Sequence, residues 1–146
     1  MKLSRKKKNT GLKRVSSRLT ERPDTIGETY KVQRVLGKGS VGVVFQCFDQ
    51  SSGRTVAIKQ VDLVGASEED QESIYLEIKL LQELCHEHIV QYFDQVRSEK
   101  DEKLYIVMEY LESGELSSLL ANLGVQPTEA LLAKYTLQIL EGVTYL

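Results

Sequence analysis

The residues best suited to chemistry are a glycine-rich run and a lysine that follows it. Residues Gly37–Val44 read GKGSVGVV, a G-x-G-x-x-G-x-V pattern, and Lys59 comes fifteen residues later at the end of Val56–Lys59, VAIK. Glycine turns let backbone N–H groups approach a polyphosphate closely, and a lysine on a nearby strand can neutralise its charge. A glycine-rich hairpin alone is common, but the two elements in this order predict a nucleotide site.

A carboxylate is also placed where it could serve that lysine. Val56, Ala57 and Ile58 make the strand around Lys59 apolar, and a lysine in a largely buried strand needs an anionic partner. Glu77 stands on an otherwise apolar helix face made by Ile74, Ile78, Leu81 and Leu84. An isolated acid there would be an ordinary boundary residue. After a phosphate-type loop and a strand lysine, it predicts a Lys59–Glu77 ion pair that holds the lysine against the phosphates.

The elements that must position these residues follow from hydrophobic spacing and turn signals. Period-2 alternation and flanking turn residues predict five strands, at Tyr30–Leu36, Val43–Asp49, Arg54–Val61, Gln91–Val96 and Leu104–Tyr110. Ser67 is a good N-cap for a helix that reaches Leu84, since acids fill its first turn. Two later helices are expected at Glu115–Ala121 and from Pro127 to Leu146. The predicted order is β-β-β-α-β-β followed by helices.

The composition is that of one ordinary globular domain. The chain has 146 residues, 41% of them hydrophobic, and no apolar run of the roughly 18 residues that a membrane span needs. The N-terminus lacks the apolar core of a secretory signal. Two cysteines, Cys47 and Cys85, make no disulfide framework, which indicates a reducing intracellular setting.

Charge divides the chain into a basic leader and an acidic body. Residues 1–24 hold nine Lys or Arg and two acids, a net charge of +7, which leaves −9 for the rest of the chain. Residues 1–26 are expected to be a disordered basic leader. Arg5–Lys8, RKKK, could be a nuclear address or a contact for an acidic surface, and a solubilising tail is the alternative. The expected location is therefore cytoplasmic or nuclear.

One short cluster could suggest a metal. Cys85, His86 and His88 lie within four residues, but a zinc site usually draws on two separated pairs of ligands, and no second cluster follows. We therefore expect no metal ligands in this chain, and interpret residues 85–88 as a loop between the helix and the fourth strand.

Taken together, these stretches resemble the N-terminal lobe of a eukaryotic protein kinase over residues 30–146. The matching text is LGKGSVGVVF from Leu36, VAIK from Val56, EIKLL from Glu77, HEHIV from His86, LYIVMEY from Leu104 and EGVTYL from Glu141. The resemblance implies an α+β fold: a five-stranded antiparallel sheet with helix C at 27–111, then the first helices of an incomplete large lobe at 112–146. It is most similar to the STE-like mitogen-activated protein kinase kinase kinases, and among them to the septation-initiation and plant epsilon-type kinases.

The resemblance also implies a role for each site residue. Lys59 and Glu77 would form the catalytic ion pair, and Leu81 and Tyr92 would occupy the regulatory-spine positions of the small lobe. Val41, at the loop tip, departs from the aromatic residue found in many kinases. The residues that would bind ATP are Leu36, Gly37, Lys38, Gly39, Ser40, Gly42, Val44, Ala57, Lys59, Met108 as gatekeeper, Glu109, Leu111 and Glu115.

The expected function is that of the ATP-binding part of a Ser/Thr protein kinase. The resemblance implies ATP and Mg²⁺ as cofactors, with the Mg²⁺ ligands and the catalytic loop lying beyond Leu146. The expected partners are ATP and a protein substrate such as a downstream kinase, with no nucleic acid. The chain alone is expected to be inactive. The alternative is a non-catalytic module that binds a nucleotide or pairs with another kinase. A Rossmann or P-loop protein is disfavoured, because neither needs a lysine in the Val56–Lys59 strand.

Overall fold

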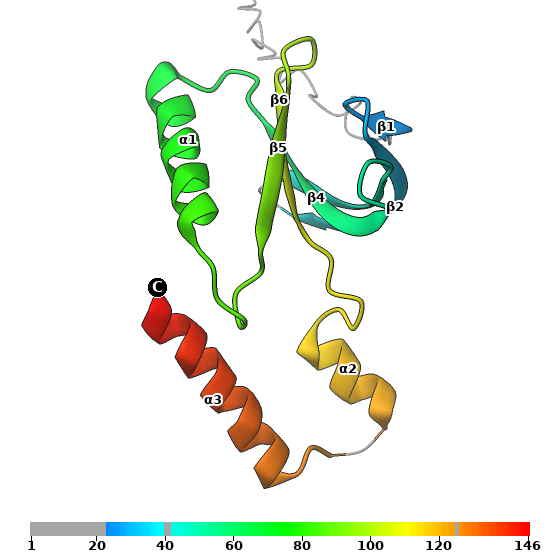
Figure 1. Ribbon diagram of the computed structural model, residues 1–146, viewed down its shortest axis with the longest axis vertical. Helices are drawn as coiled ribbons and strands as arrows, with labels where there is room; N and C mark the ends of the chain where they lie inside the picture. The colour runs from blue at the N-terminus through cyan, green and yellow to red at the C-terminus, as the bar shows by residue number, and fades with distance from the viewer. Residues whose placement is uncertain (1–22, 40–41, 125) are drawn as a thin grey trace, which may run out of the picture.

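The computed structural model describes residues 23–39, 42–124 and 126–146, and it confirms the predicted α+β order (Figure 1). The sheet precedes and follows helix α1, and two further helices come last. The elements are β1 (Thr25–Ile26), β2 (Tyr30–Gly39), β3 (Gly42–Asp49), β4 (Arg54–Asp62), α1 (Glu68–Glu83), β5 (Tyr92–Ser98), β6 (Lys103–Glu109), α2 (Leu116–Leu123) and α3 (Glu129–Tyr145).

All strands of the described residues join one antiparallel sheet in the order β1-β2-β3-β4-β6-β5. The prediction of five strands is wrong by one, because Thr25 and Ile26 pair with Lys31 and Tyr30 inside the stretch that was assigned to the leader. A two-residue strand is too short to show a period of two. Residues 1–22 of the predicted leader lie outside the described residues.

The sheet curls so that its two ends approach each other. Tyr30 on β2 donates a hydrogen bond to Asp94 on β5 at 3.3 Å, although three strands separate them in the sheet order. Burial and the Asp94 carboxylate raise the pKa of Tyr30 to about 12. The main core fills the inside of this curl and includes Ile26, Tyr30, Val32, Phe45, Cys47, Val56, Ile58, Tyr105 and Val107. This core fixes the strands on which the candidate site lies.

Helix α1 packs on the opposite face of the sheet. Ser67 caps it through a reciprocal capping box with Asp70, as the N-cap signal predicted. Ile78 is 2% exposed and packs with Leu63, Leu104 and Ile106 in a second, smaller core. Figure 1 shows the helix running alongside β5 and β6.

The turn between β3 and β4 is built around Asp49. Its carboxylate accepts hydrogen bonds from the Ser51 N–H and hydroxyl at 2.8 and 2.7 Å and from the Ser52 hydroxyl at 2.5 Å. Gly53 adopts φ 71°, the positive value expected of this turn. The serine hydrogen bonds hold the pKa of Asp49 down at about 2.

We therefore expect the stability that Asp49 contributes to depend on pH. A depressed carboxylate pKa stabilises the folded chain above the unfolded value of 3.8, and this contribution is lost as the pH falls from about 4 to about 2. Asp49→Asn should lower the free energy of unfolding by about 1 kcal/mol at pH 7, measured by urea titration. The difference from wild type should shrink toward pH 2.5, and a difference that is independent of pH would contradict this account.

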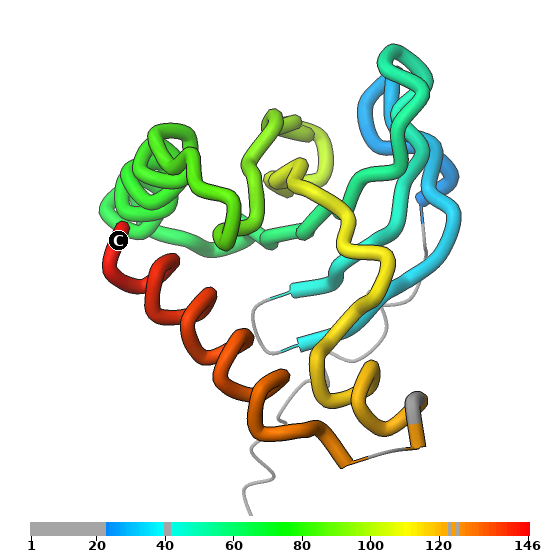
Figure 2. The backbone as a smooth tube through the Cα atoms, turned by 60° about the horizontal axis from the view of Figure 1, so that its bottom comes forward, coloured from blue at the N-terminus to red at the C-terminus, as the bar shows by residue number. Residues whose placement is uncertain are grey.

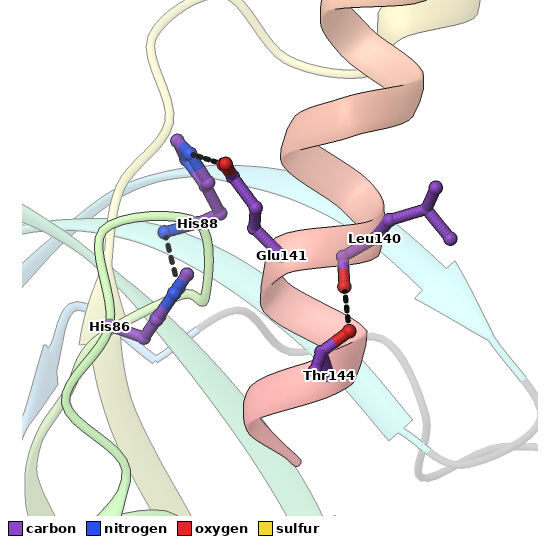
Figure 3. A network of polar contacts seen from close by, with 5 residues as sticks. All are labelled: His86, His88, Leu140, Glu141 and Thr144. Atoms are coloured by element: carbon purple, nitrogen blue, oxygen red, sulfur yellow. Dashed lines mark hydrogen bonds and ion pairs between the residues drawn. The ribbon is translucent and has the colours of Figure 1, made fainter.

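Helices α2 and α3 lie below the sheet in Figure 1, and Figure 2 shows the C-terminal end of α3 close to α1. The Cys85 N–H donates to the Tyr145 hydroxyl at 3.1 Å, and His88 Nε2 lies 3.1 Å from a Glu141 carboxylate oxygen (Figure 3). A Cβ on Gly142 would lie 3.1 Å from the His88 carbonyl oxygen, so a larger residue would crowd this contact. The contacts tie the loop after α1 to the last turn of α3.

Leucine, isoleucine and valine side chains of α3 remain exposed, namely Leu132, Leu137, Ile139, Leu140 and Val143. No helix in the described part of the chain has the length and apolar character to cross a membrane.

Candidate nucleotide-binding site

The three glycines of the G-x-G-x-x-G pattern differ in what surrounds them. Gly37 and Gly39 end β2, and a Cβ on either would meet nothing within 4 Å. Gly42 has φ 140°, and a Cβ there would lie 2.0 Å from the Gln60 carbonyl oxygen. The first two glycines therefore leave space beside the strand, and the third is required by backbone packing. Ser40 and Val41, between them, lie outside the described residues.

Strand register gathers the other expected residues on one face of the sheet. Val44 on β3 pairs with both Gly37 and Lys59, and Lys59 pairs with Ile106. Two residues before Lys59 on β4, Ala57 pairs with Met108. Directly opposed residues of antiparallel strands project to the same side, and so do alternate residues of one strand. Val44, Ala57, Lys59 and Met108 therefore share a face that is continuous with the glycine strand.

The same face carries α1. Ile106 is opposite Lys59 in the ladder and packs with Ile78 of α1 in the second core. Lys59 is half-buried, whereas Glu77, next to Ile78, is exposed. The predicted ion pair is absent: in the part of the chain that the structure describes, no salt bridge joins Lys59 to Glu77. Helix and lysine share a sheet face, but the Glu77 side chain is exposed.

The chain leaves the site through the end of β6. The Glu109 N–H donates to the Gln91 carbonyl at 2.8 Å, and the Glu109 carboxylate accepts from the Gln91 N–H at 3.3 Å.

Residues 111–115, which follow β6, are exposed. The Leu111 carbonyl accepts a hydrogen bond from the Gly114 N–H, and Leu111 is 50% exposed. Glu115 is the exposed N-cap residue of α2 and accepts a hydrogen bond from Ser117. Leu36 and Lys38 on β2 are also exposed.

This arrangement fits a purine nucleotide. Ala57, 7% exposed, and half-buried Val44 and Met108 offer small and flexible apolar surfaces for a flat ring. Lys59 stands two residues from Ala57 along β4, level with Val44 and its partner Gly37, where phosphates would extend. The described residues include no cluster of three or more His, Cys, Asp or Glu side chains able to hold a metal ion.

Sequence reasoning missed two polar contacts that hold α1 on β5. Arg97 of β5 donates to the Tyr75 hydroxyl and lies over the Tyr75 ring, 5.7 Å from its centre. Gln82 donates to the Tyr92 hydroxyl at 3.1 Å. The available signal was the seven-residue spacing of Tyr75 and Gln82, which places two polar side chains on one flank of the helix.

Comparisons with known proteins agree with the geometry. Residues 30–146 match the family model described as the protein kinase domain. The chain is 40% identical over 116 residues to human mitogen-activated protein kinase kinase kinase 3, covering 77% of this chain and 18% of that protein. It is 41% identical over 117 residues to cytokinesis protein sepH of Aspergillus niger, covering 80% of this chain and 8% of sepH. Against MAP3K epsilon protein kinase 1 of Arabidopsis thaliana it is 37% identical over 123 residues, 84% of this chain and 9% of that protein. The chain thus spans less than a fifth of the length of these curated relatives.

Proposed function

This chain belongs to the protein kinase family, and on that premise we propose that it forms the ATP-binding part of an intracellular Ser/Thr kinase that phosphorylates proteins. The register of the sheet carries the proposal. It sets Lys59 beside Val44, two residues along β4 from Ala57 and its partner Met108, on the face that also carries α1. This order of a glycine strand, an apolar ring platform and a lysine suits a nucleotide with its phosphates toward β2.

Each residue has a physical task in this proposal. Val44, Ala57, Met108 and Leu36 enclose the adenine ring, and the backbone of Glu109 and Leu111 faces its polar edge. Glu115 is suited to the ribose hydroxyls. Backbone N–H groups of the glycine strand and the Lys59 ammonium neutralise the phosphates, which supplies positioning and charge stabilisation for phosphoryl transfer.

Glu77 acts on the nucleotide only through Lys59. When α1 turns toward the sheet, the Glu77 carboxylate can hold the Lys59 ammonium in place. With Glu77 exposed, Lys59 lacks that support. The helix orientation therefore sets how well the lysine is positioned.

The proposed protein substrate is a downstream kinase, as the name of the human relative suggests.

Lys59→Met is the test of this function. We expect the whole 146-residue chain to bind Mg-ATP saturably in a calorimetric titration, and the variant to bind at least about tenfold more weakly because it loses a charge-assisted contact. Lys31 is an exposed lysine on β2, outside the proposed site. The Lys31→Met variant is therefore the matched control and should bind Mg-ATP like wild type. Equal affinities for wild type and Lys59→Met would overturn the assignment.

A non-catalytic role is the second candidate, and the absent Lys59–Glu77 pair favours it. In that case Mg-ATP binds, Lys59→Met weakens the binding, and the Glu77→Gln variant matches wild type.

A further inference from the structure

Arg34 joins two parts of the sheet that the strand order keeps apart. Its Nε donates to the Gln46 side-chain oxygen Oε1 at 2.6 Å, and its Nη2 donates to the Tyr110 hydroxyl at 3.1 Å. Arg34 lies on β2 and Tyr110 directly follows β6, although β3 and β4 separate these two strands in the sheet. Three strand spacings amount to about 14 Å, so only two long side chains can meet across them. The planar guanidinium is suited to hold two acceptors at once.

The strand register places these contacts on the face proposed to bind the nucleotide. Arg34 pairs with Gln46, Gln46 pairs with Ala57, and Ala57 pairs with Met108. Directly opposed residues project to the same side of a sheet, so Arg34 and Gln46 extend the row that contains the ring platform. Tyr110 comes two residues after Met108, and its hydrogen bond to Arg34 agrees with a position on the same face.

Tyr110 lies at the end of the site away from the phosphates. Lys59 comes two residues after Ala57 on β4, and β6 runs antiparallel to β4. Tyr110 is therefore displaced from Ala57 in the direction opposite to Lys59. It also stands between Glu109 and Leu111, whose backbone groups are proposed to face the polar edge of the ring. Holding the Tyr110 side chain limits how far that backbone can move away from β2.

We propose that Arg34 and Tyr110 form a clamp that ties β2 to the segment after β6 and fixes the width of the nucleotide site at its ring end. Gln46 orients the Arg34 guanidinium. The proposal rests on the nucleotide-binding function proposed above and adds three positioning residues to it. Arg34 is exposed, and Gln46 and Tyr110 are half-buried, so loss of the clamp should leave the sheet folded.

Amide hydrogen exchange tests the clamp without any nucleotide. The segment 109–114 contains two hydrogen-bonded amides, those of Glu109 and Gly114. In the whole 146-residue chain, Arg34→Met and Tyr110→Phe should each accelerate exchange in this segment about threefold, because it opens more often once the bond is lost. The double variant should exchange no faster than Arg34→Met alone, since both changes remove the same contact. Wild-type exchange rates in both single variants would overturn the clamp.

Lys31→Met is the matched control for Arg34→Met. Lys31 lies three residues before Arg34 on the same strand, and its replacement removes the same charge. Its exchange in the segment after β6 and its affinity for Mg-ATP should match those of wild type. An acceleration as large as that of Arg34→Met would show that the charge of β2 acts on the segment, and would contradict the clamp.

Ligand affinity tests where the clamp acts. Equilibrium dialysis with labelled ligand compares Mg-ATP with adenosine, which has no phosphates. Arg34→Met should weaken both about threefold, because the clamp acts at the ring end, whereas Lys59→Met should weaken Mg-ATP and leave adenosine unchanged. The urea midpoint of Arg34→Met should stay close to that of wild type, which separates positioning from a loss of folding. A loss confined to Mg-ATP would mean that Arg34 acts on the phosphates, and would overturn the proposal.

The clamp and the proposed function fail in different ways. If no version of the chain binds Mg-ATP or adenosine, the proposed function fails, while the exchange rates still decide whether Arg34 ties β2 to the segment after β6. If Lys59→Met weakens Mg-ATP binding but Arg34→Met exchanges and binds like wild type, the clamp fails and the proposed function stands.

Discussion

Gly42→Ala is expected to lower the free energy of unfolding by about 3 kcal/mol or more. At φ 140° an alanine is strained, and its Cβ would lie 2.0 Å from the Gln60 carbonyl oxygen, a distance that the paired strands β3 and β4 can relieve only by separating. The measurement is a urea titration of the chain followed by far-ultraviolet circular dichroism.

Gly39→Ala is the matched control for that experiment. A Cβ on Gly39 would meet nothing within 4 Å, so the unfolding midpoint of the Gly39→Ala variant should stay close to that of wild type. The two variants separate the third glycine of the pattern, which the backbone requires, from one that leaves room for a ligand. Similar midpoints for Gly42→Ala and Gly39→Ala would contradict this distinction.

The second large effect is expected from Ile58→Ala. Ile58 is 0% exposed at the centre of the main core, on the strand that carries Ala57 and Lys59 on its other face. Removing most of its side chain should cost about 3 kcal/mol of unfolding free energy, because the surrounding strands cannot collapse fully into the cavity. The measurement is again the urea midpoint, accompanied by Mg-ATP affinity under folding conditions.

Leu80→Ala is the control, since this leucine of α1 is 57% exposed and should change stability by less than about 0.5 kcal/mol. Under conditions in which Ile58→Ala remains folded, its Mg-ATP affinity should stay within a few-fold of wild type, because Ile58 faces away from the site. A loss of stability no larger than that of Leu80→Ala would show that the core was misassigned.

Periodic and capped segments were predictable from the sequence. The apolar–polar alternation from Tyr30 onward and the Ser67 N-cap with its acidic first turn gave the strands and α1 with errors of a few residues at the ends. The short strand at Thr25–Ile26 escaped prediction because two residues carry no period. The family could also be predicted, because the glycine run and VAIK are each contiguous sequence motifs. The match of residues 30–146 to the protein kinase domain confirms that prediction.

The orientation of α1 was not predictable in the same way. An acid on an apolar face suggested that Glu77 turns inward, whereas the structure leaves it exposed. Two polar contacts between α1 and β5 join Tyr75 to Arg97 and Gln82 to Tyr92, ten or more residues apart in the sequence, and depend on a rotation of the helix that spacing alone does not specify. The binding and catalytic roles of all the expected site residues, from Leu36 to Glu115, stay predictions.

The loop after α1 anchors the C-terminal end of the helix. Leu84 ends the helix, and the next residue, Cys85, is bound through its N–H to Tyr145 of α3. Any tilt of α1 therefore swings about its C-terminal end. Glu77 lies about 10 Å from that pivot along the axis, and Glu68 lies about 24 Å from it. A partner that displaces the first turn of α1 by a given distance therefore moves Glu77 by less than half that distance.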